Sequence, residues 1–410
     1  MTSRDVIHSF WVPEFRVKQD VLPGENLVKQ LRITPIKEGK YQVMCAELCG
    51  GSHAYMTAPV NVVSKADFDT WIAGQVNAST ADPAERERRL QDLIRRVKDE
   101  GRGKRYDCIV GVSGGADSAY ALYTARQHGL RPLAVHMDNG WNSELAVNNI
   151  ENLVRKLGVD LYTHVVEWRE YRALQQAFFD ADVIDVELLY DNAMLAVNYE
   201  LAQRYGTRWI LSGSNTTTEG MRVPRNFNWN KFDRRNILAI ARRDGVRVKS
   251  LPTIGVARYV WHRLVRRTRW LPFLDYVDYD KQRCIDLLVR EIGYRPYPYK
   301  HYESIFTRFY QGYLLPTKFG VDKRRMHLSS LICSGQMTRD EALAHLERSP
   351  YPDPDDLQVD IEYFLKKMGW SQADLDAYLA RPEQPHDAYA SEAALYARLL
   401  ALQKRFLPGR

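Results

Sequence analysis

The sequence contains no uninterrupted apolar run long enough to cross a lipid bilayer, and its first residues, MTSRDVIHS, are too polar for a signal peptide. Cysteine is scarce, with five residues in a chain of 410. An odd number in a chain of this length argues against a disulfide framework and favours a reducing compartment. The sequence also lacks internal repeats and low-complexity tracts. These absences predict a globular protein of the cytoplasm with no membrane segment.

The charge balance is basic. Lys and Arg number 58 against 51 Asp and Glu, which gives a net charge of +7 and a pI near 9.0. Such a balance suits an anionic ligand such as a nucleotide, a nucleotide sugar or a nucleic acid, and does not choose among them.

The first hundred residues divide into two parts of different character. The first part is residues 1–78. Residues 5–63 alternate apolar and polar side chains between the turns VLPGEN and KEGK, which predicts short antiparallel strands, and residues 65–76 predict a short helix that closes the unit. Residues 79–105 predict a charged linker helix that begins at Asp82-Pro83 and ends at Gly101. Its apolar residues at helical spacing are Leu90, Leu93, Ile94 and Val97.

A strand–turn–helix pattern repeats over residues 106–256. The β-rich runs are DCIVGV, PLAVHM, LYTHVV and WILSG, and the helical segments are SAYALYTARQHG, SELAVNNIENLVRKLG and DNAMLAVNYELAQRYG. This alternation predicts an α/β fold in which helices cover both faces of a parallel, doubly wound sheet. Strand signals fade beyond about residue 257, so we expect residues 257–410 to be mostly helical.

The segment SGGADS, residues 113–118, lies where the strand DCIVGV ends and a helix begins. Its small residues allow a sharp turn whose backbone N–H groups can approach an anion, and the helix beginning at Ser118 adds its positive dipole end. Asp117 is placed to hold Mg²⁺ against a pyrophosphate. The lysine of the longer GxxxxGK[ST] phosphate loop is absent. The alternative is a glycine-rich turn that binds no ligand.

SGGADS resembles the pyrophosphatase loop of the ATP pyrophosphatase superfamily, whose members cleave ATP to AMP and pyrophosphate while adenylating an acceptor. Further segments are together similar to the N-acetyl sugar amidotransferase family, over residues 84–390. They are HMDNGWNSELAVNNIENLVRKLG, WILSGSNTTTEGM, KHYESIFTRFYQ and DKRRMHLSSLICSGQMTRDEA.

This resemblance implies a role in surface-polysaccharide biosynthesis, with ATP and Mg²⁺ as cofactors and an N-acetylated, nucleotide-linked sugar as substrate. An amide carbonyl is a poor electrophile, so its oxygen must first become a leaving group. Transfer of AMP onto the acetamido oxygen achieves this, and ammonia then displaces AMP to leave an acetamidino group. The family receives ammonia from glutaminase and cyclase-like partner subunits.

The expected site residues follow the strands at the carboxyl edge of the predicted sheet. The expected catalytic residues are Asp117, Ser118, Asp138, Lys300 and His301. The expected nucleotide-binding residues are Ser113, Gly114, Gly115, Asp117, Ser118, Gly213, Ser214, Asn215 and Glu219.

Two assignments have a structural alternative. Arg324 and Arg325 are expected to bind the diphosphate of a nucleotide sugar, although charge runs such as DKRR are also typical of a solvated surface. Asn215 and Glu219 could instead form a solvated turn with a helix cap.

A rival hypothesis comes from tRNA modification, in which the same type of loop adenylates a base. The segment WHRLVRRTRW, residues 261–270, interleaves arginines with aromatic residues and could support RNA binding. Thiolating enzymes of this kind need a cysteine pair, whereas Cys108, Cys284 and Cys333 are isolated in sequence. We therefore regard a nucleic-acid partner as the weaker hypothesis. WHRLVRRTRW otherwise predicts an amphipathic helix that packs on the catalytic domain or forms a homo-oligomer contact.

The N-terminal residues carry a second resemblance. DVIHSFWVPEFRVKQDVLPG and CAELCGGSHAYM are similar to the dinuclear copper domain of cytochrome c oxidase subunit II, which implies a partial cupredoxin-like fragment over residues 2–73. Thiolate, imidazole and thioether ligands suit copper. The ligands implied by the resemblance are His8, Cys45, Glu47 through its backbone carbonyl, Cys49, His53 and Met56.

Three hypotheses remain open for this fragment: a passive relic of a gene fusion or of a misjoined gene model, a structural metal site, or a working electron-transfer centre. The family's copper domain has earlier strands and a membrane anchor, which we expect before residue 2 and do not find. A partial sandwich leaves open edges and holds ligands less rigidly.

Overall fold

A computed structural model describes residues 7–21, 31, 33–47, 57–67, 82–221, 223, 227–297, 303–351 and 353–406, with side chains up to residue 399. The chain divides into two compact units, Met1–Asn77 and Ala78–Arg410. Among the described residues no helix is long and apolar enough to cross a membrane.

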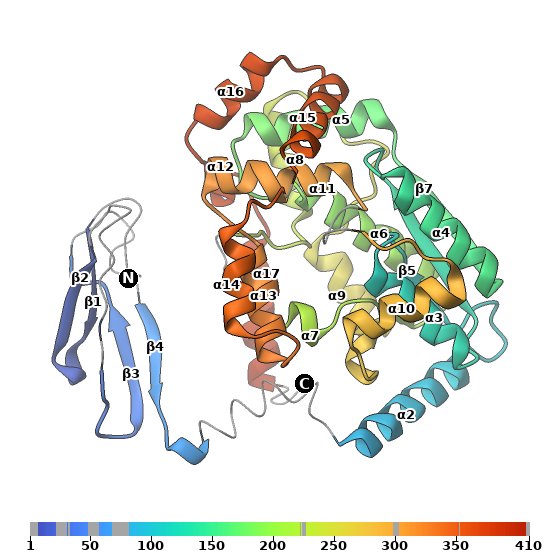
Figure 1. Ribbon diagram of the computed structural model, residues 1–410, viewed down its shortest axis with the longest axis horizontal. Helices are drawn as coiled ribbons and strands as arrows, with labels where there is room; N and C mark the ends of the chain where they lie inside the picture. Colours follow the sequence, from blue (N-terminus) through green and yellow to red (C-terminus); the bar gives the residue numbers. More distant parts are fainter. Residues whose placement is uncertain are drawn as a thin grey trace. The chain divides into compact units, whose positions relative to one another are not determined.

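The first unit contains an antiparallel sheet with the strand order β2-β1-β3-β4 (Figure 1). The short helix η1 (Pro13–Phe15) connects the first two strands. The strands are β1 (His8–Val12), β2 (Val17–Val21), β3 (Gly39–Met44) and β4 (Thr57–Val62). The prediction of short antiparallel strands is confirmed for these residues.

The second unit is built on a five-stranded parallel sheet with the order β7-β6-β5-β8-β9. The strands are β5 (Cys108–Gly111), β6 (Pro132–Asp138), β7 (Asp160–Val165), β8 (Trp209–Ser212) and β9 (Arg269–Pro272). The first four are the β-rich runs of the sequence, and the predicted α/β class is confirmed. Because the strands are parallel, the loops after β5, β6 and β8 meet at one edge of the sheet.

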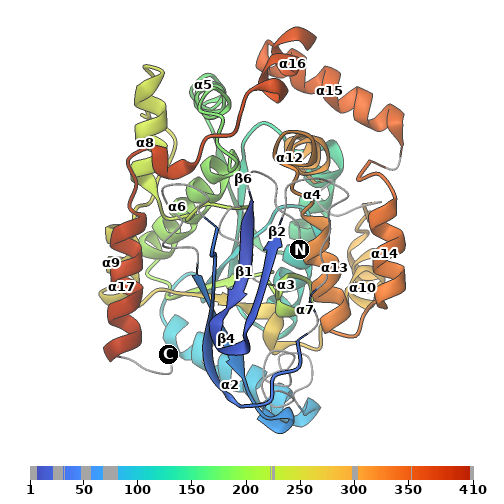
Figure 2. The ribbon, with the colours of Figure 1, turned by 90° about the vertical axis from the view of Figure 1, so that its left-hand side faces the viewer.

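Helices cover both faces of this sheet, as predicted (Figures 1 and 2). Cys108 and Val110 of β5 pack in one core with α2, α3, α4 and α10, whereas Ile109 packs against α6 on the other face. All three side chains are fully buried. The helices around the sheet are α2 (Pro83–Gly101), α3 (Ala116–Gln127), α4 (Glu144–Leu157), α5 (Trp168–Asp180), α6 (Leu188–Arg204), α7 (Thr216–Glu219), α8 (Arg234–Arg243), α9 (Val256–Leu264), η3 (Phe273–Tyr276) and α10 (Lys281–Ile292).

The linker helix α2 has the predicted limits. Pro83 is its first residue, and the carboxylate of Asp82 caps it by accepting a hydrogen bond from the amide of Ala84 (3.1 Å). Its buried side includes the four residues predicted from helical spacing, Leu90, Leu93, Ile94 and Val97.

The fifth strand, β9, lies past residue 256, where we expected a mostly helical chain. Its four residues, RWLP, are too few to show an apolar run or an alternation in the sequence. In the structure all four are only partly buried. Pairing with β8, from Trp209 opposite Arg269 to Ser212 opposite Pro272, makes this segment a strand. The sheet therefore extends beyond the predicted boundary.

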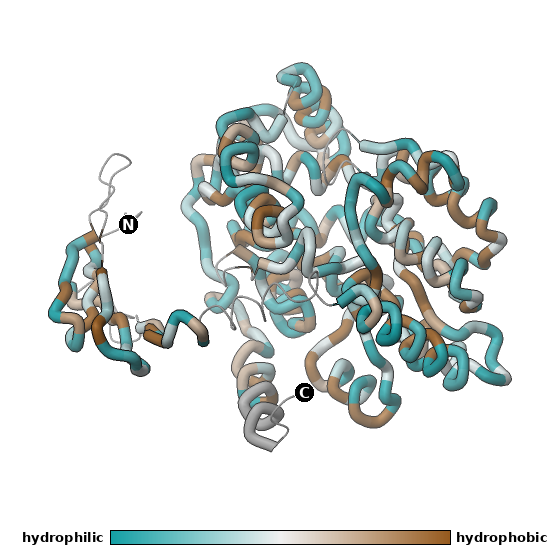
Figure 3. The backbone as a smooth tube through the Cα atoms, turned by 60° about the horizontal axis from the view of Figure 1, so that its bottom comes forward, coloured by the Kyte–Doolittle hydropathy of each residue, from teal (hydrophilic) through white to brown (hydrophobic). Residues whose placement is uncertain are grey.

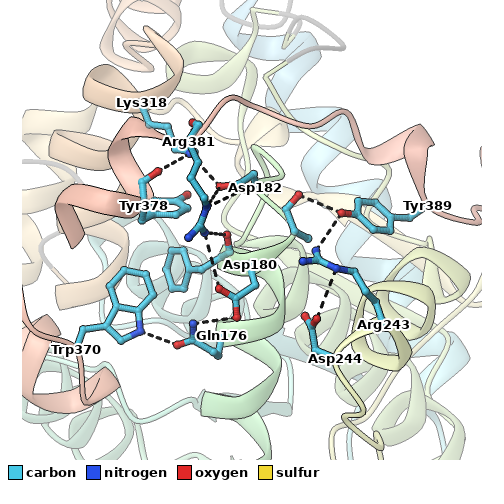
Figure 4. Close-up of polar contacts among 12 residues, drawn as sticks. Gln176, Asp180, Asp182, Arg243, Asp244, Lys318, Trp370, Tyr378, Arg381 and Tyr389 are labelled. Atoms are coloured by element: carbon cyan, nitrogen blue, oxygen red, sulfur yellow. Dashed lines mark hydrogen bonds and ion pairs between the residues drawn. The ribbon is translucent and has the colours of Figure 1, made fainter. Parts of the chain in front are cut away.

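The rest of the chain is mostly helical, and α11, η4, α12, α15 and α16 pack against α5, α6 and α8 in a third core. Hydrophobic and hydrophilic residues are interspersed along the helices of the second unit (Figure 3). Polar contacts join the C-terminal residues to α5: the Trp370 indole donates to Gln176 (2.6 Å), and Arg381 pairs with Asp182 (3.0 Å) (Figure 4). The elements are α11 (Ile305–Phe309), the π-helical turn η4 (Tyr310–Leu314), α12 (Leu315–Phe319), α13 (Arg324–Cys333), α14 (Arg339–Glu347), α15 (Pro354–Met368), α16 (Gln372–Ala380), η5 (His386–Ala388) and α17 (Ala393–Phe406).

Candidate functional site

The segment SGGADS forms the turn between β5 and α3. The helix begins at Ala116, two residues earlier than expected, so that Asp117 and Ser118 lie in its first turn. Gly115 is the N-cap and has no side chain that could accept a hydrogen bond from the first amides of the helix. An anion at this point would meet those amides and the positive end of the helix dipole.

Two glycines allow the close approaches around this turn. Gly114 has a φ of +87°, and a Cβ atom there would lie 2.9 Å from the Cα and carbonyl oxygen of Ala146 in α4. A Cβ atom on Gly213, after β8, would lie 2.7 Å from the carbonyl carbon of Asp117 and the nitrogen of Ser118. Neither position accepts a side chain without a shift of neighbouring backbone.

Hydroxyl groups hold the turn in shape. The Oγ atoms of Ser113 and Ser118 lie 3.2 Å apart, and Ser118 Oγ donates to the carbonyl oxygen of Gly115 (3.1 Å). The backbone amide of Ser113 donates to Ser118 Oγ (3.2 Å). The turn is therefore shaped by its own serines before any ligand binds.

The turn forms one wall of a cavity of about 500 Å³. Several predicted site residues from β5, α3 and the β8 loop line it: Ser113, Gly115, Asp117, Ser118, Gly213, Ser214 and Glu219. Glu303 and Lys281 also line it, so the described lining residues carry three carboxylates and one ammonium group. A polyphosphate in this cavity would require a divalent cation, and carboxylate ligands fit Mg²⁺.

Asp117 has a partner that sequence reasoning did not find. The hydroxyl of Tyr279 donates a hydrogen bond to Asp117 Oδ1. Burial raises the pKa of Tyr279, so the phenol remains a donor at neutral pH. This bond fixes the carboxylate at the start of α3.

Asp138 ends β6, as predicted, and lies beside the cavity lining, not within it. Its Oδ1 accepts hydrogen bonds from the amide of Gly140 (2.8 Å) and from Nδ2 of Asn142 (3.1 Å). Asn142 also contacts Nε2 of His136 (3.0 Å), whose Nδ1 lies 3.0 Å from the carbonyl oxygen of Val112. Burial lowers the pKa of His136, which agrees with a neutral ring that donates to Val112 and accepts from Asn142.

Other predicted residues lie elsewhere. Asn215 caps α7 by accepting a hydrogen bond from the amide of Thr218 (2.8 Å), which is the structural alternative considered for it. Gly114 does not line the cavity, although its turn does. Lys300 and His301 fall outside the described residues.

The two arginines of DKRR do not reach the cavity lining. Arg324 pairs with Asp322 (2.8 Å) and donates to the carbonyl oxygens of His345 (3.1 Å) and Arg348 (2.8 Å). These contacts join α13 to the end of α14. Arg325 is exposed.

Other residues of the cavity lining that sequence reasoning missed include Tyr190, Asn198 and Tyr297. The hydroxyl of Tyr297 donates to the carbonyl oxygen of Gly114 (3.1 Å) and so supports the turn from outside. Glu303 lies in the segment KHYES, where the expectation fell on its neighbours Lys300 and His301. The motif was therefore a usable signal, and the roles expected of Lys300 and His301 stay predictions.

In the first unit, three predicted copper ligands lie together. Cys45 Sγ lies 3.8 Å from His8 Nδ1 and 3.4 Å from the carbonyl oxygen of Glu47, to which its thiol donates. Thiolate and imidazole are donor types that copper prefers. Cys49, His53 and Met56 fall outside the described residues, and within the described ones no three His, Cys, Asp or Glu residues form a metal-binding group.

Both parts of the chain match known families. Residues 303–403 match the family model "LPS biosynthesis protein WbpG-like, C-terminal domain", and residues 1–63 match "Cytochrome C oxidase subunit II, periplasmic domain". The chain joins a WbpG-like C-terminal domain to a subunit II-like segment. The WbpG-like match begins at Glu303, which lines the same cavity as SGGADS.

Curated relatives are similar to a small share of the chain. Cytochrome c oxidase subunit 2 of Thermostichus vulcanus is 45% identical over 95 residues, which are 23% of this chain and 28% of that protein. The chain thus spans about a quarter of the length of the curated relatives that it matches.

Two solved structures are similar to parts of the chain. The periplasmic domain of subunit II of the Bradyrhizobium japonicum cytochrome oxidase is 38% identical, with a TM-score of 0.16, and covers 17% of this chain and 50% of that one. The NMN synthetase of Francisella tularensis is 15% identical, with a TM-score of 0.32, and covers 62% of this chain and 94% of that one.

Proposed function

We propose that residues 84–390 form an ATP-dependent amidotransferase that converts the acetamido group of an N-acetylated, nucleotide-linked sugar into an acetamidino group. The observation that carries the proposal is a single cavity lined both by the SGGADS turn and by Glu303, the first residue of the WbpG-like match. The family description names LPS biosynthesis, a process that consumes sugar substrates.

The proposed reaction has two steps. The acetamido oxygen attacks the α-phosphorus of ATP, the bond to the β-phosphate breaks, and pyrophosphate leaves. Ammonia then attacks the carbon of the resulting imidate, AMP leaves with the former amide oxygen, and the amidine remains after loss of a proton.

The residues of the turn have positioning and charge-neutralising roles in this proposal. The first amides of α3 and the hydroxyls of Ser113 and Ser118 would bind the phosphates, and Asp117 would hold Mg²⁺, which neutralises the departing pyrophosphate. Tyr279 would keep the Asp117 carboxylate oriented. A glutaminase and a cyclase-like partner would supply ammonia, and the need for ATP and a nucleotide sugar favours the cytoplasm.

The tRNA-modification alternative finds little support at the cavity. No cysteine is among the described residues that line it. Cys108 is fully buried in β5, and burial raises the pKa of its thiol, which makes a thiolate nucleophile unfavourable there.

Pyrophosphate release by the full chain tests the proposal. Without ammonium the reaction stops at the imidate after one release of pyrophosphate. We therefore expect sustained release from ATP and Mg²⁺ only when an N-acetylated UDP-sugar and ammonium are both present, with an amidine product detected by mass spectrometry. If tRNA stimulates release and no sugar does, the rival is correct. Release of pyrophosphate in the absence of both sugar and tRNA would contradict the proposal. So would the failure to release pyrophosphate under any of these conditions.

The contacts of Cys45 favour a second function for the first unit, that of binding copper. We expect the copper-loaded chain to retain stoichiometric metal and to show thiolate–copper absorption. Cys45→Ser should abolish both signals, whereas Cys333→Ser, a matched change of the exposed cysteine on α13, should abolish neither. Copper retention by Cys45→Ser, or no retention by the unaltered chain, would contradict a copper site.

A further inference from the structure

The helix α9, which contains the start of the segment WHRLVRRTRW, has one face in the core and an apolar face in solvent. On the inner side His262 is fully buried, with its ring centroid 5.0 Å from that of Tyr199 in α6. On the outer side Trp261 is 39% exposed, Leu264 70% and Val265 64%. Residues at positions i, i+3 and i+4 share one side of a helix, so these three side chains form one apolar surface, the α9 patch.

Arginines surround the α9 patch. The patch arginines, Arg263, Arg266 and Arg267, are all exposed, and residues 256–268 contain no aspartate or glutamate. The guanidinium of Arg266 lies 6.0 Å from the centroid of the Trp261 ring. In the described part of the chain the patch arginines form no ion pair with a carboxylate. Their charge is therefore available to a partner.

The positive charge continues beyond α9. Burial, and then the charges of Arg208 and Arg266, lower the pKa of Lys104, which follows α2. One carboxylate lies among these cations, that of Glu100, and it pairs with Arg269 at the start of β9 (2.9 Å). The fold thus brings cations from three segments to the surface that carries the α9 patch.

The combination of exposed aliphatic side chains with arginines distinguishes among partners. RNA would use aromatic rings and arginines, but it offers nothing to the aliphatic Leu264 and Val265. A second copy in a twofold contact would bring the patch arginines of both chains together, where they repel each other. An anionic lipid layer suits both features, because its phosphates attract arginines and the region below its headgroups accepts tryptophan and aliphatic side chains.

We propose that the α9 patch is a membrane-binding surface: its three apolar side chains enter the headgroup region of an anionic lipid layer, and the patch arginines contact the lipid phosphates. The chain then lies on the membrane at this point and does not span it. The patch precedes the amino end of β9, whereas the SGGADS turn follows the carboxyl end of β5. Lipid contact therefore leaves the SGGADS turn open, and the inference does not depend on the proposed reaction.

The first test uses the full chain and two kinds of vesicle, one of phosphatidylcholine alone and one that also contains phosphatidylglycerol. We expect the chain to sediment with the anionic vesicles only, and less so as salt is added. Arg267→Gln should lower the partition coefficient about fivefold, since this is the contribution of one cation near an anionic surface. No binding to anionic vesicles, or equal binding to both kinds, would overturn the inference.

A double variant isolates the apolar contribution. Leu264→Ser with Val265→Ser should reduce partition to anionic vesicles by about tenfold or more, because apolar burial in the interface is lost. The matched control is Val165→Ser with Val359→Ser, which changes two valines that are 66% and 61% exposed on β7 and α15, and it should bind as the unaltered chain does. All four side chains are exposed, so neither variant should unfold.

Two further outcomes would overturn the inference. One is equal binding of vesicles by the α9 double variant and the unaltered chain. The other is a chain that ignores vesicles but loses tRNA binding, or a dimer seen by sedimentation, when the α9 patch is altered. That result would assign the patch to RNA or to a second copy.

Discussion

Gly114→Ala should reduce ATP-dependent pyrophosphate release by about 100-fold, because small displacements of positioning groups have effects of this size. Two independent penalties act at this position. The φ of +87° is unfavourable for a residue with a Cβ atom, and that atom would lie 2.9 Å from the backbone of Ala146 in α4. The turn must then move away from α4, which displaces Ser113, Gly115 and the start of α3.

Gly245→Ala is the matched control for this change. Gly245 follows α8, has a φ of +71°, and has no atom within 4 Å of a Cβ built on it. It shares the left-handed backbone penalty of about 1 kcal/mol and lacks the collision. We expect its melting temperature to fall slightly while its rate of pyrophosphate release is unchanged. Equal losses of activity in both variants would show that general destabilisation, not displacement of the turn, is the cause.

The sheet could be predicted well from the sequence because its strands carry local signals. The runs DCIVGV and WILSG are short, apolar and bounded by turn residues, and the helices between them repeat apolar residues at helical spacing. The SGGADS turn was equally visible, since a positive-φ glycine, a missing cap and two serines are properties of residues adjacent in sequence. These features depend on neighbours within a few positions along the chain.

The features that escaped prediction depend on distant partners. β9 is a strand only because β8 pairs with it, 60 residues earlier along the chain at Trp209 and Arg269. Tyr279 gains its role from a contact with Asp117, 162 positions away. Asn198 looks like any polar residue of a helix until the fold places it beside the cavity.

Arg324 shows how a visible charge can have partners within the protein, and its diphosphate-binding role stays a prediction. The DKRR run predicted a diphosphate site. In the structure the guanidinium of Arg324 binds Asp322 and two carbonyl oxygens at the end of α14. Those carbonyl groups lie 21 and 24 residues further along, and a helix end with unpaired carbonyls cannot be located from residue types alone. A charged motif therefore predicts that an ion-pairing partner exists, without identifying it as a ligand or a part of the protein.

Lys318→Met should lower the free energy of unfolding of the second unit by about 3 kcal/mol, because it leaves two carbonyl oxygens without their donor and removes one of the two cations that pair with Asp182. The Lys318 side chain is 1% exposed and lies 3.0 Å from the carboxylate of Asp182. It also donates to the carbonyl oxygens of Tyr378 (2.6 Å) and Arg381 (2.7 Å) at the end of α16 (Figure 4). One ammonium group thus satisfies three acceptors from segments far apart in sequence. Urea unfolding followed by circular dichroism measures the loss.

Arg88→Met provides the comparison, since Arg88 on α2 pairs with Glu85 at a fully solvated position where its side chain is 71% exposed. Exposed pairs of this kind contribute less than about 0.5 kcal/mol, so this variant should unfold almost as the unaltered chain does. The double variant Lys318→Met with Asp182→Asn should not recover the loss, because Arg381 also pairs with Asp182 and would lose its carboxylate partner. If Lys318→Met costs no more than Arg88→Met, the buried ammonium does not hold α12, α16 and the residues after α5 together. Recovery in the double variant would instead assign the loss to the Asp182 carboxylate and not to the two carbonyl contacts.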